Sequence, residues 1–320
     1  MRASVVIPTY QRPRLLDRCL AAIAAQDFDP AAHEVIVVDD AASAATRRQV
    51  EGSAPWFRAD LRYLPVNGRH GPAAARNIGW RAARGEIIAF TDDDCIPEPG
   101  WLRTGLATFG PGVAAVAGRT IVPLPEEPTD YERNAARLEV AEFITANCFC
   151  RREALERVGG FDERFAVAWR EDSDLYFSLL ERGDRIVRAP GAVVLHPVRP
   201  APWGISLRLQ RNTVFDALLY KKHPALYRRR IRPVPPWNYY ASVASFVASL
   251  AAAAAGQPRV AWIAAGAWAA LTGQFCWRRL RWTSRDPRHI AEMVATSALI
   301  PLLSIFWRIY GSWRFRVLFL

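Results

Sequence analysis

The stretch IIAFTDDDCIPEPGW, residues 87–101, is the part of the sequence that decides the fold class. It begins with apolar or small residues typical of a buried strand, continues into three adjacent aspartates, Asp92, Asp93 and Asp94, and ends in a proline-containing turn. Three carboxylates at the end of a buried strand repel one another and are costly to desolvate. We therefore expect a positive partner beside them.

The sequence on both sides of this stretch alternates short β-branched runs with helical stretches, as in a parallel sheet with crossover helices. Strands are predicted at 4–7, 34–38, 61–64, 86–90, 113–117 and 192–195, the first ending at Pro8. Helices are predicted at 15–25, 73–83 and 172–182, the last closing on Gly183. Because ligands gather at the carboxyl ends of strands in such sheets, we expect Thr9, Asp39, Asp40 and the three aspartates to face one crevice.

The composition is that of a folded protein with anionic partners. The chain has 320 residues, 51% of them apolar, and a formal charge of +11, which favours nucleotide phosphates, anionic lipid or nucleic acid without choosing among them. Its five cysteines form no CxxC pair, so we expect neither a zinc site nor a disulfide framework. The N-terminal apolar run is too short for a cleaved export signal.

Beyond the α/β pattern the composition changes. Residues 201–236 form a basic segment with several prolines, and two long uncharged stretches follow at 237–257 and 260–277. Their lengths and flanking aromatic residues favour a two-helix membrane hairpin over a pair of soluble alanine-rich helices, with both ends cytoplasmic by the positive-inside rule. A third stretch at about 290–310 is predicted to be an interfacial or re-entrant helix, which makes 237–320 a membrane-associated region.

Three acidic clusters lie at predicted element ends: Asp39 with Asp40, Asp92 to Asp94, and Glu171 with Asp172. Carboxylate oxygens at strand ends suit Mg²⁺ or Mn²⁺ bridging a diphosphate. The first and third clusters have an alternative interpretation as helix caps or first-turn acids. Three aspartates after a strand are harder to explain structurally, and the combination favours a metal site.

Six pieces of the sequence stand out within residues 1–200: VVIPTYQR, VVDDAAS, NGRHGPAAARNIGW, FTDDDC, TANCFCRREALERVGGFDERF and REDSDLYFSLLERG. Together, and in this order, they resemble the motifs of the family-2 glycosyltransferases of the GT-A fold. The resemblance implies a Rossmann-like, mostly parallel sheet flanked by helices. It also implies transfer of a sugar from a nucleotide-diphosphate donor to an acceptor hydroxyl, with inversion at the anomeric carbon.

The resemblance further implies roles for individual residues. Contacts to the nucleotide sugar are expected from Thr9, Asp40, Arg76, Asp92 and Asp93. Arg76 in particular is expected near the diphosphate, where a cation belongs.

The remaining roles concern the metal and the chemistry. The ion, Mg²⁺ or Mn²⁺, is expected on Asp94, Asp92 and His196. Asp172 matches the family's catalytic base, with Glu171 in support, and contacts to donor or acceptor are expected from Asn147 and Asp174.

The sequence departs from the family pattern at two places. Ala41 replaces the usual glycine of the VDDGS segment, which indicates a backbone with no need of positive φ there. The QxxRW motif of processive synthases is absent, which favours transfer of a single sugar. The acceptor is expected to be a lipid-linked or cell-envelope glycan, at the cytoplasmic side of the cell inner membrane.

Two other functions stay open from the sequence. A sugar nucleotidyltransferase also uses aspartate-bound metal, but it would need a glycine-rich basic loop where this chain has PTYQR. A non-catalytic membrane-bound scaffold is the other. Nucleic acid is not expected as a partner, because the basic residues crowd next to apolar stretches.

Overall fold

A computed structural model describes residues 2–320. The chain divides into two compact units: the first runs to Pro123 and resumes over Ala136–Val198, and the second comprises Leu124–Ala135 and Arg199–Leu320. The change of composition near residue 200 therefore coincides with a change of unit. No sequence feature indicated that 124–135 belongs with the C-terminal unit.

The first unit is built on a sheet of eight strands in the order β3-β2-β1-β4-β7-β6-β8-β5. The strands are β1 Ala3–Thr9, β2 His33–Asp39, β3 Asp60–Pro65, β4 Ile87–Phe90, β5 Ile96–Pro97, β6 Val113–Ile121, β7 Cys148–Arg151 and β8 Arg185–Leu195. The strands β1 to β4 are mutually parallel, as are β6 and β8, whereas β7 runs antiparallel between β4 and β6 and β5 antiparallel to β8. The expected mostly parallel α/β fold is confirmed, with β5 and β7 as antiparallel strands that the periodicity did not predict.

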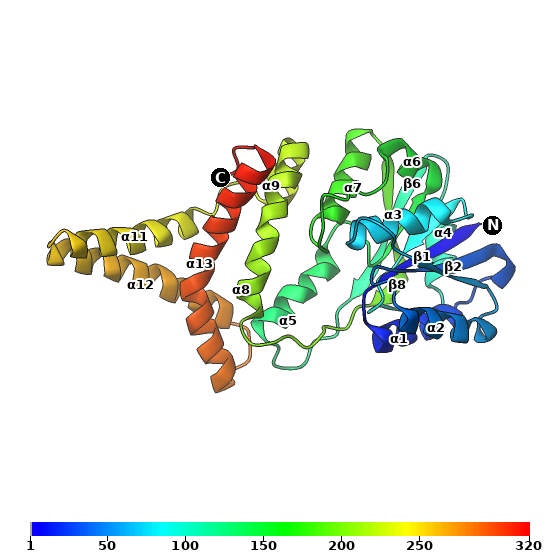
Figure 1. Cartoon of the computed structure of the whole chain (residues 1–320), viewed down its shortest axis with the longest axis horizontal. Helices are drawn as coiled ribbons and strands as arrows, with labels where there is room; N and C mark the ends of the chain where they lie inside the picture. The colour runs from blue at the N-terminus through cyan, green and yellow to red at the C-terminus, as the bar shows by residue number, and fades with distance from the viewer. Residues whose placement is uncertain (1) are drawn as a thin grey trace. The chain divides into compact units, whose positions relative to one another are not determined.

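Helices cover both faces of this sheet (Figure 1). They are α1 Pro13–Ala24, α2 Ala44–Ser53, α3 Pro72–Ala82, α4 Trp101–Ala107, α6 Arg152–Val158 and α7 Glu171–Glu181. Because side chains alternate along a strand, Val5 and Ile7 pack with α1 and α2 in one core, while Val6 packs with α3, α6 and α7 in the other. The sheet is thus buried on both faces, as parallel sheets require.

The register brings the ends of distant strands to one edge. Thr9 pairs with Asp39, Phe90 at the end of β4 pairs with Cys148, and Ile121 pairs with Leu195. The segments that follow β1, β2, β4, β6 and β8, and the segment that precedes β7, therefore open on the same edge of the sheet.

Strand β1 continues through Pro8 to Thr9, one difference from the sequence prediction. Its pairing with β4 ends at Val6, so beyond that point β1 has a strand neighbour on the β2 side alone. A proline, which has no N–H to donate, is tolerated where one side of the strand is unpaired.

The second unit is helical. Its helices include α5 Asp130–Ala135, α8 Ile205–Leu209, α9 Thr213–Lys222, α11 Trp237–Ala254, α12 Pro258–Leu280 and α13 Pro287–Phe315. The helices α11 and α12 run side by side, and α13 packs on α9 (Figure 1). The buried Arg279 of α12 joins three helices: its guanidinium donates to Asp130 of α5 at 2.8 Å and to Thr296 of α13 at 2.6 Å. Arg279, which follows the second uncharged stretch closely in the sequence, is thus buried inside the helical unit.

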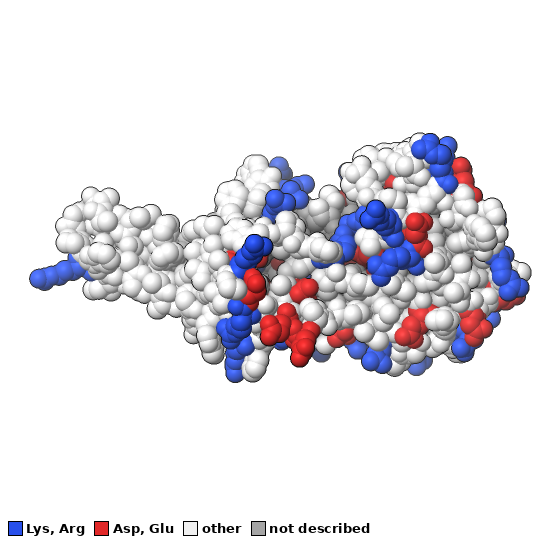
Figure 2. Space-filling model, turned by 90° about the horizontal axis from the view of Figure 1, so that it is seen from below, with Lys and Arg blue, Asp and Glu red and all other residues white. Residues whose placement is uncertain are grey.

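The apolar helices differ in character. Within residues 2–320, α13 is the one helix that is both long and apolar enough to cross a membrane. Of its most apolar 18-residue stretch, 39% is buried inside the protein. It is longer than the stretch expected at 290–310 and continues through Pro301. The helices α11 and α12 occupy the stretches expected to form a hairpin, but neither meets the combined length, hydropathy and charge requirements of a membrane-spanning helix. They leave large apolar side chains exposed to solvent, such as Trp262 (77% exposed). Figure 2 shows few charged side chains over them.

Candidate active site

Asp93, the middle aspartate after β4, is paired within the protein. Its carboxylate accepts a hydrogen bond from the Thr9 hydroxyl at 2.8 Å and forms an ion pair with Arg12 at 3.1 Å. Burial raises the pKa of Asp93, while Arg12 and Thr9 act in the opposite direction. Sequence reasoning missed Arg12 as the partner, although it lies in the quoted segment VVIPTYQR. The Thr9 hydroxyl, which was expected to contact the nucleoside, donates its hydrogen bond to Asp93.

Asp92 and Glu171 share one buried arginine. Arg76 of α3 donates from one terminal nitrogen to Asp92 at 2.7 Å and from the other to Glu171 at 3.0 Å. Its side chain is 2% exposed, and its Nε has no hydrogen-bond partner among the described residues. Arg76 therefore holds the segment after β4 to the start of α7. Both terminal nitrogens that were expected near the diphosphate bind carboxylates of the protein.

Glu171 and Asp172 begin α7, as the sequence predicted, directly after Arg170 in a left-handed conformation with φ 76°. Burial raises the pKa of Glu171 to about 7, against the lowering effect of Arg76. Burial also raises the pKa of Asp172, against hydrogen bonds from the backbone N–H and hydroxyl of Ser173. Asp174, two residues after Asp172, is also buried. Two neighbouring carboxyl groups with raised pKa values are characteristic of acid–base chemistry.

Asp94, Cys95 and His196 form a group of side chains that could hold a metal ion. Oδ1 of Asp94 is 3.6 Å from Nε2 of His196, and the ligand atoms of Asp94, Cys95 and His196 all lie within 4.8 Å of one another. A carboxylate and an imidazole suit Mn²⁺, whereas burial raises the pKa of the Cys95 thiol and keeps it protonated. Nδ1 of His196 is buried and has no partner among the described residues. The chemistry of the donor set therefore fits a divalent ion on Asp94 and His196, with Asp92 held by Arg76 beside them.

The two aspartates at the end of β2, Asp39 and Asp40, make different contacts. Asp39 is fully buried and accepts hydrogen bonds from the backbone of Ala41 and Ser43 and from the Tyr63 hydroxyl. The Asp39 carboxylate thus stabilises the loop that follows β2. The left-handed residue of this loop is Ala42, with φ 48°, so Ala41 does not need positive φ, as expected.

Asp40, the residue expected at the nucleoside, is half-buried at the same edge. Its carboxylate accepts a hydrogen bond from the backbone N–H of Gly71 at 3.0 Å and lies 3.0 Å from Nδ1 of His70. Sequence reasoning did not single out His70. Asp40 therefore ties the loop after β2 to the loop that precedes α3.

Asn147 is fully buried, and its side-chain amide is occupied by the protein. Its oxygen accepts from the Trp101 indole at 2.8 Å, and its nitrogen donates to the carbonyl groups of Arg119 and Ala192, each at 2.9 Å. The amide thereby joins β6 and β8 next to the start of β7. Its side chain supports the edge of the sheet from within.

Three comparisons with known proteins bear on this site. Residues 4–161 match the family model described as Glycosyl transferase family 2. The chain is 29% identical over 211 residues to glycosyltransferase AglE of Haloferax volcanii, covering 62% of this chain and 67% of that protein. It is 35% identical over 182 residues to the pre-mycofactocin glycosyltransferase of Mycobacterium tuberculosis, covering 52% of this chain but 37% of that protein.

A solved structure shares the fold. The mannosyltransferase PcManGT from Pyrobaculum calidifontis, in complex with GDP-Man and Mn²⁺, superimposes with a TM-score of 0.61 at 23% identity, over 96% of this chain and 87% of that chain. The arrangement of strands and helices is therefore one that known proteins adopt over nearly the whole length of this chain.

Proposed function

Because this chain belongs to glycosyl transferase family 2 and is a glycosyltransferase, we propose that it moves a single sugar from a nucleotide-diphosphate sugar to an acceptor hydroxyl, with inversion at the anomeric carbon. The observation that carries the proposal is the joint position of Asp94, His196 and Asp172. Asp94 and His196 follow strand ends on one edge of the sheet. Arg76 forms ion pairs with Asp92 and with Glu171, and thereby connects the segment that contains Asp94 to the segment that contains Asp172.

A divalent ion, Mg²⁺ or Mn²⁺, fits the proposal through Asp94 and His196. When bound there, it would offset the negative charge that develops on the leaving diphosphate. The presence of Mn²⁺ and GDP-Man in the complex of PcManGT supports this assignment.

Asp172 is the proposed base for the acceptor hydroxyl. Its raised pKa makes the carboxylate a better proton acceptor than an ordinary aspartate, while its hydrogen bonds from Ser173 orient it. Glu171, with a pKa of about 7, holds a proton in part of the molecules at neutral pH and thereby limits the negative charge beside Asp172. Inversion requires that the hydroxyl attack from the face opposite the leaving diphosphate, so Asp172 would take the proton on the side of the sugar away from the nucleotide.

We propose further that the helical unit binds the cytoplasmic side of the cell inner membrane and that the acceptor is a lipid-linked or cell-envelope glycan. Exposed apolar side chains support this, among them Trp262 and Ile263 on α12 and Trp313 on α13, which are 77%, 74% and 73% exposed. Large exposed apolar side chains are typical of surfaces that bind a membrane or another protein.

Calorimetric titration of the detergent-solubilised full chain with a panel of nucleoside diphosphates, with and without Mn²⁺, tests the donor site. We expect Mn²⁺-dependent binding of one nucleotide, its loss in Asp94→Ala, and its retention in Asp27→Ala, which removes an exposed carboxylate elsewhere. Asp172→Asn should bind the nucleotide but lose transfer. Folded wild-type protein that binds no nucleotide in either condition would contradict the proposal.

A further inference from the structure

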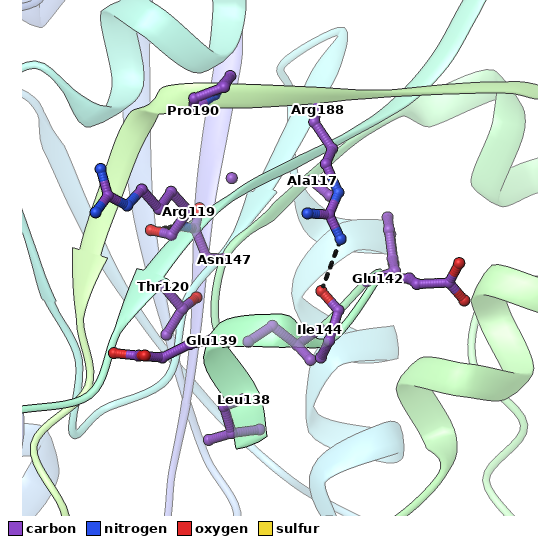
Figure 3. Close-up of a pocket in the computed structure, with 13 residues that line it drawn as sticks. Ala117, Arg119, Thr120, Leu138, Glu139, Glu142, Ile144, Asn147, Arg188 and Pro190 are labelled. Atoms are coloured by element: carbon purple, nitrogen blue, oxygen red, sulfur yellow. Dashed lines mark hydrogen bonds between the residues drawn. The ribbon is translucent and has the colours of Figure 1, made fainter. Parts of the chain in front are cut away.

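A cavity of about 250 Å³ lies within the first unit (Figure 3). It is formed by the carboxyl-terminal part of β6, by β8 near its bend, and by the segment 138–144 that precedes β7. No residue expected at the donor lines it except Asn147, whose amide is already occupied. The cavity is thus a separate feature of the unit.

The walls of the cavity belong to elements that also carry residues of the candidate active site. Thr120, which lines it, pairs with Val194 in the register of β6 and β8, and His196 lies two residues further on, about 7 Å along the strand direction. On the other side, Phe143 stacks on Tyr176 of α7 with ring centroids 5.4 Å apart. The first turn of that helix carries Asp172. The walls of the cavity are therefore continuous with the strand that leads to His196 and with the helix that carries Asp172.

The polar groups that face the cavity are hydrogen-bond donors. The Thr120 side chain is 5% exposed, and its hydroxyl has no partner among the residues that the structure describes. In Figure 3 the Arg188 guanidinium extends into the cavity, where it donates to the Ala141 carbonyl group at 3.3 Å and keeps further N–H groups. A buried hydroxyl without a partner is costly, so the cavity is built for a polar occupant.

The acidic residues of the wall are directed elsewhere. Glu139 accepts a hydrogen bond from the backbone N–H of Val122 at 2.7 Å, and the carboxylate of Glu142 points away from the cavity in Figure 3. The rest of the wall includes the apolar side chains of Leu138 and Ile144. A ligand with one apolar face and several oxygen acceptors matches this lining. A sugar ring has both.

We propose that this cavity binds one sugar ring of the acceptor, with Thr120 and Arg188 donating hydrogen bonds to its oxygen atoms. The proposal rests on the function proposed above. The volume is below the roughly 300–1,000 Å³ of sites for drug-sized ligands, so it suits a single ring and leaves the rest of the acceptor outside. The ring in the cavity would direct a hydroxyl toward Asp172 from the side away from the nucleotide.

Saturation-transfer NMR on the full chain tests this, with methyl β-glucoside and methyl β-glucuronide as probes. Both are added after the nucleoside diphosphate and Mn²⁺ that calorimetry has identified. We expect saturation transfer to at least one probe, and binding about three- to tenfold weaker in Thr120→Val and in Arg188→Gln, the loss of one hydrogen bond. Arg185→Gln is the matched control, because Arg185 is exposed on the same strand and does not line the cavity.

The possible results separate the two proposals. Tighter binding of the glucuronide that depends on Arg188 would support a carboxylate-bearing ring, and equal binding of both probes would support hydroxyl recognition. Wild-type protein that binds the nucleotide but neither probe, or variants that bind the probes as the wild type does, would overturn the acceptor site alone. Failure of the wild type to bind any nucleotide would overturn the proposed function and the acceptor site with it.

Discussion

Replacing Arg76 with glutamine should destabilise the first unit strongly, because Arg76 is the buried cation between two carboxylates. Its side chain is 2% exposed, that of Glu171 is 4% exposed and that of Asp92 is 26% exposed. Removing one partner of a buried ion pair costs about 3–5 kcal/mol, since the other partner stays buried and unpaired. The Asp92 contact adds little to this figure, because water screens a partly exposed carboxylate.

The effect should depend on pH with a definite sign. The pKa of Glu171 is raised from 4.5 to about 7, so between these values the folded protein holds a proton that the unfolded chain has lost. The contribution of Glu171 to stability is therefore fully present below pH 4.5 and falls as the pH rises to about 7. Without Arg76 the pKa of Glu171 would rise further and the fall would continue above pH 7. The difference between wild type and variant should thus be small at pH 5 and largest at pH 8 or above.

Urea unfolding of the full chain at pH 5 and pH 8.5, followed by far-ultraviolet circular dichroism, measures this difference. Arg81→Gln is the control on the same helix, because Arg81 is 53% exposed and its distance to Glu163 is 3.7 Å. It should cost less than about 1 kcal/mol. If Arg76→Gln unfolds at the wild-type urea concentration but loses nucleotide affinity, Arg76 serves the diphosphate and does not stabilise the first unit through its ion pairs.

Three further predictions concern the metal, the packing and the base. His196→Ala should weaken Mn²⁺-dependent nucleotide binding about tenfold or more in calorimetry, and unchanged affinity would exclude His196 as a ligand. Gly118→Ala should lower the free energy of unfolding by about 1–3 kcal/mol, because the new Cβ would lie 2.1 Å from the Asn147 side chain, whereas Gly110→Ala meets nothing within 4 Å and should fold normally. Asp172→Asn should lower turnover about 10²–10⁴-fold in a transfer assay at saturating nucleotide sugar, and a variant with near wild-type turnover would require another base.

Local sequence pattern predicted much of the sheet and the positions of the acidic residues. The runs that become β1, β2, β3 and β4 are short, β-branched and bounded by turn residues, so period and punctuation are enough to place them. The aspartates after β4 follow from the same reasoning. Strand β7 was missed, because it is only four residues long, its first three residues are all buried and show no alternation, and its partners lie far away in the chain.

The sequence by itself determined which residues gather at the carboxyl edge of the sheet, since in a parallel sheet that edge collects whatever follows each strand. The tertiary structure alone decided how these residues are paired. Arg76 and Glu171 are 95 residues apart, and Arg12 and Asp93 are 81 apart, so no local pattern links them. The cavity at Thr120 likewise depends on how 138–144 packs over β6 and β8. Ion pairing and cavity shape depend on the distances between side chains, and those distances exist only after the chain has folded.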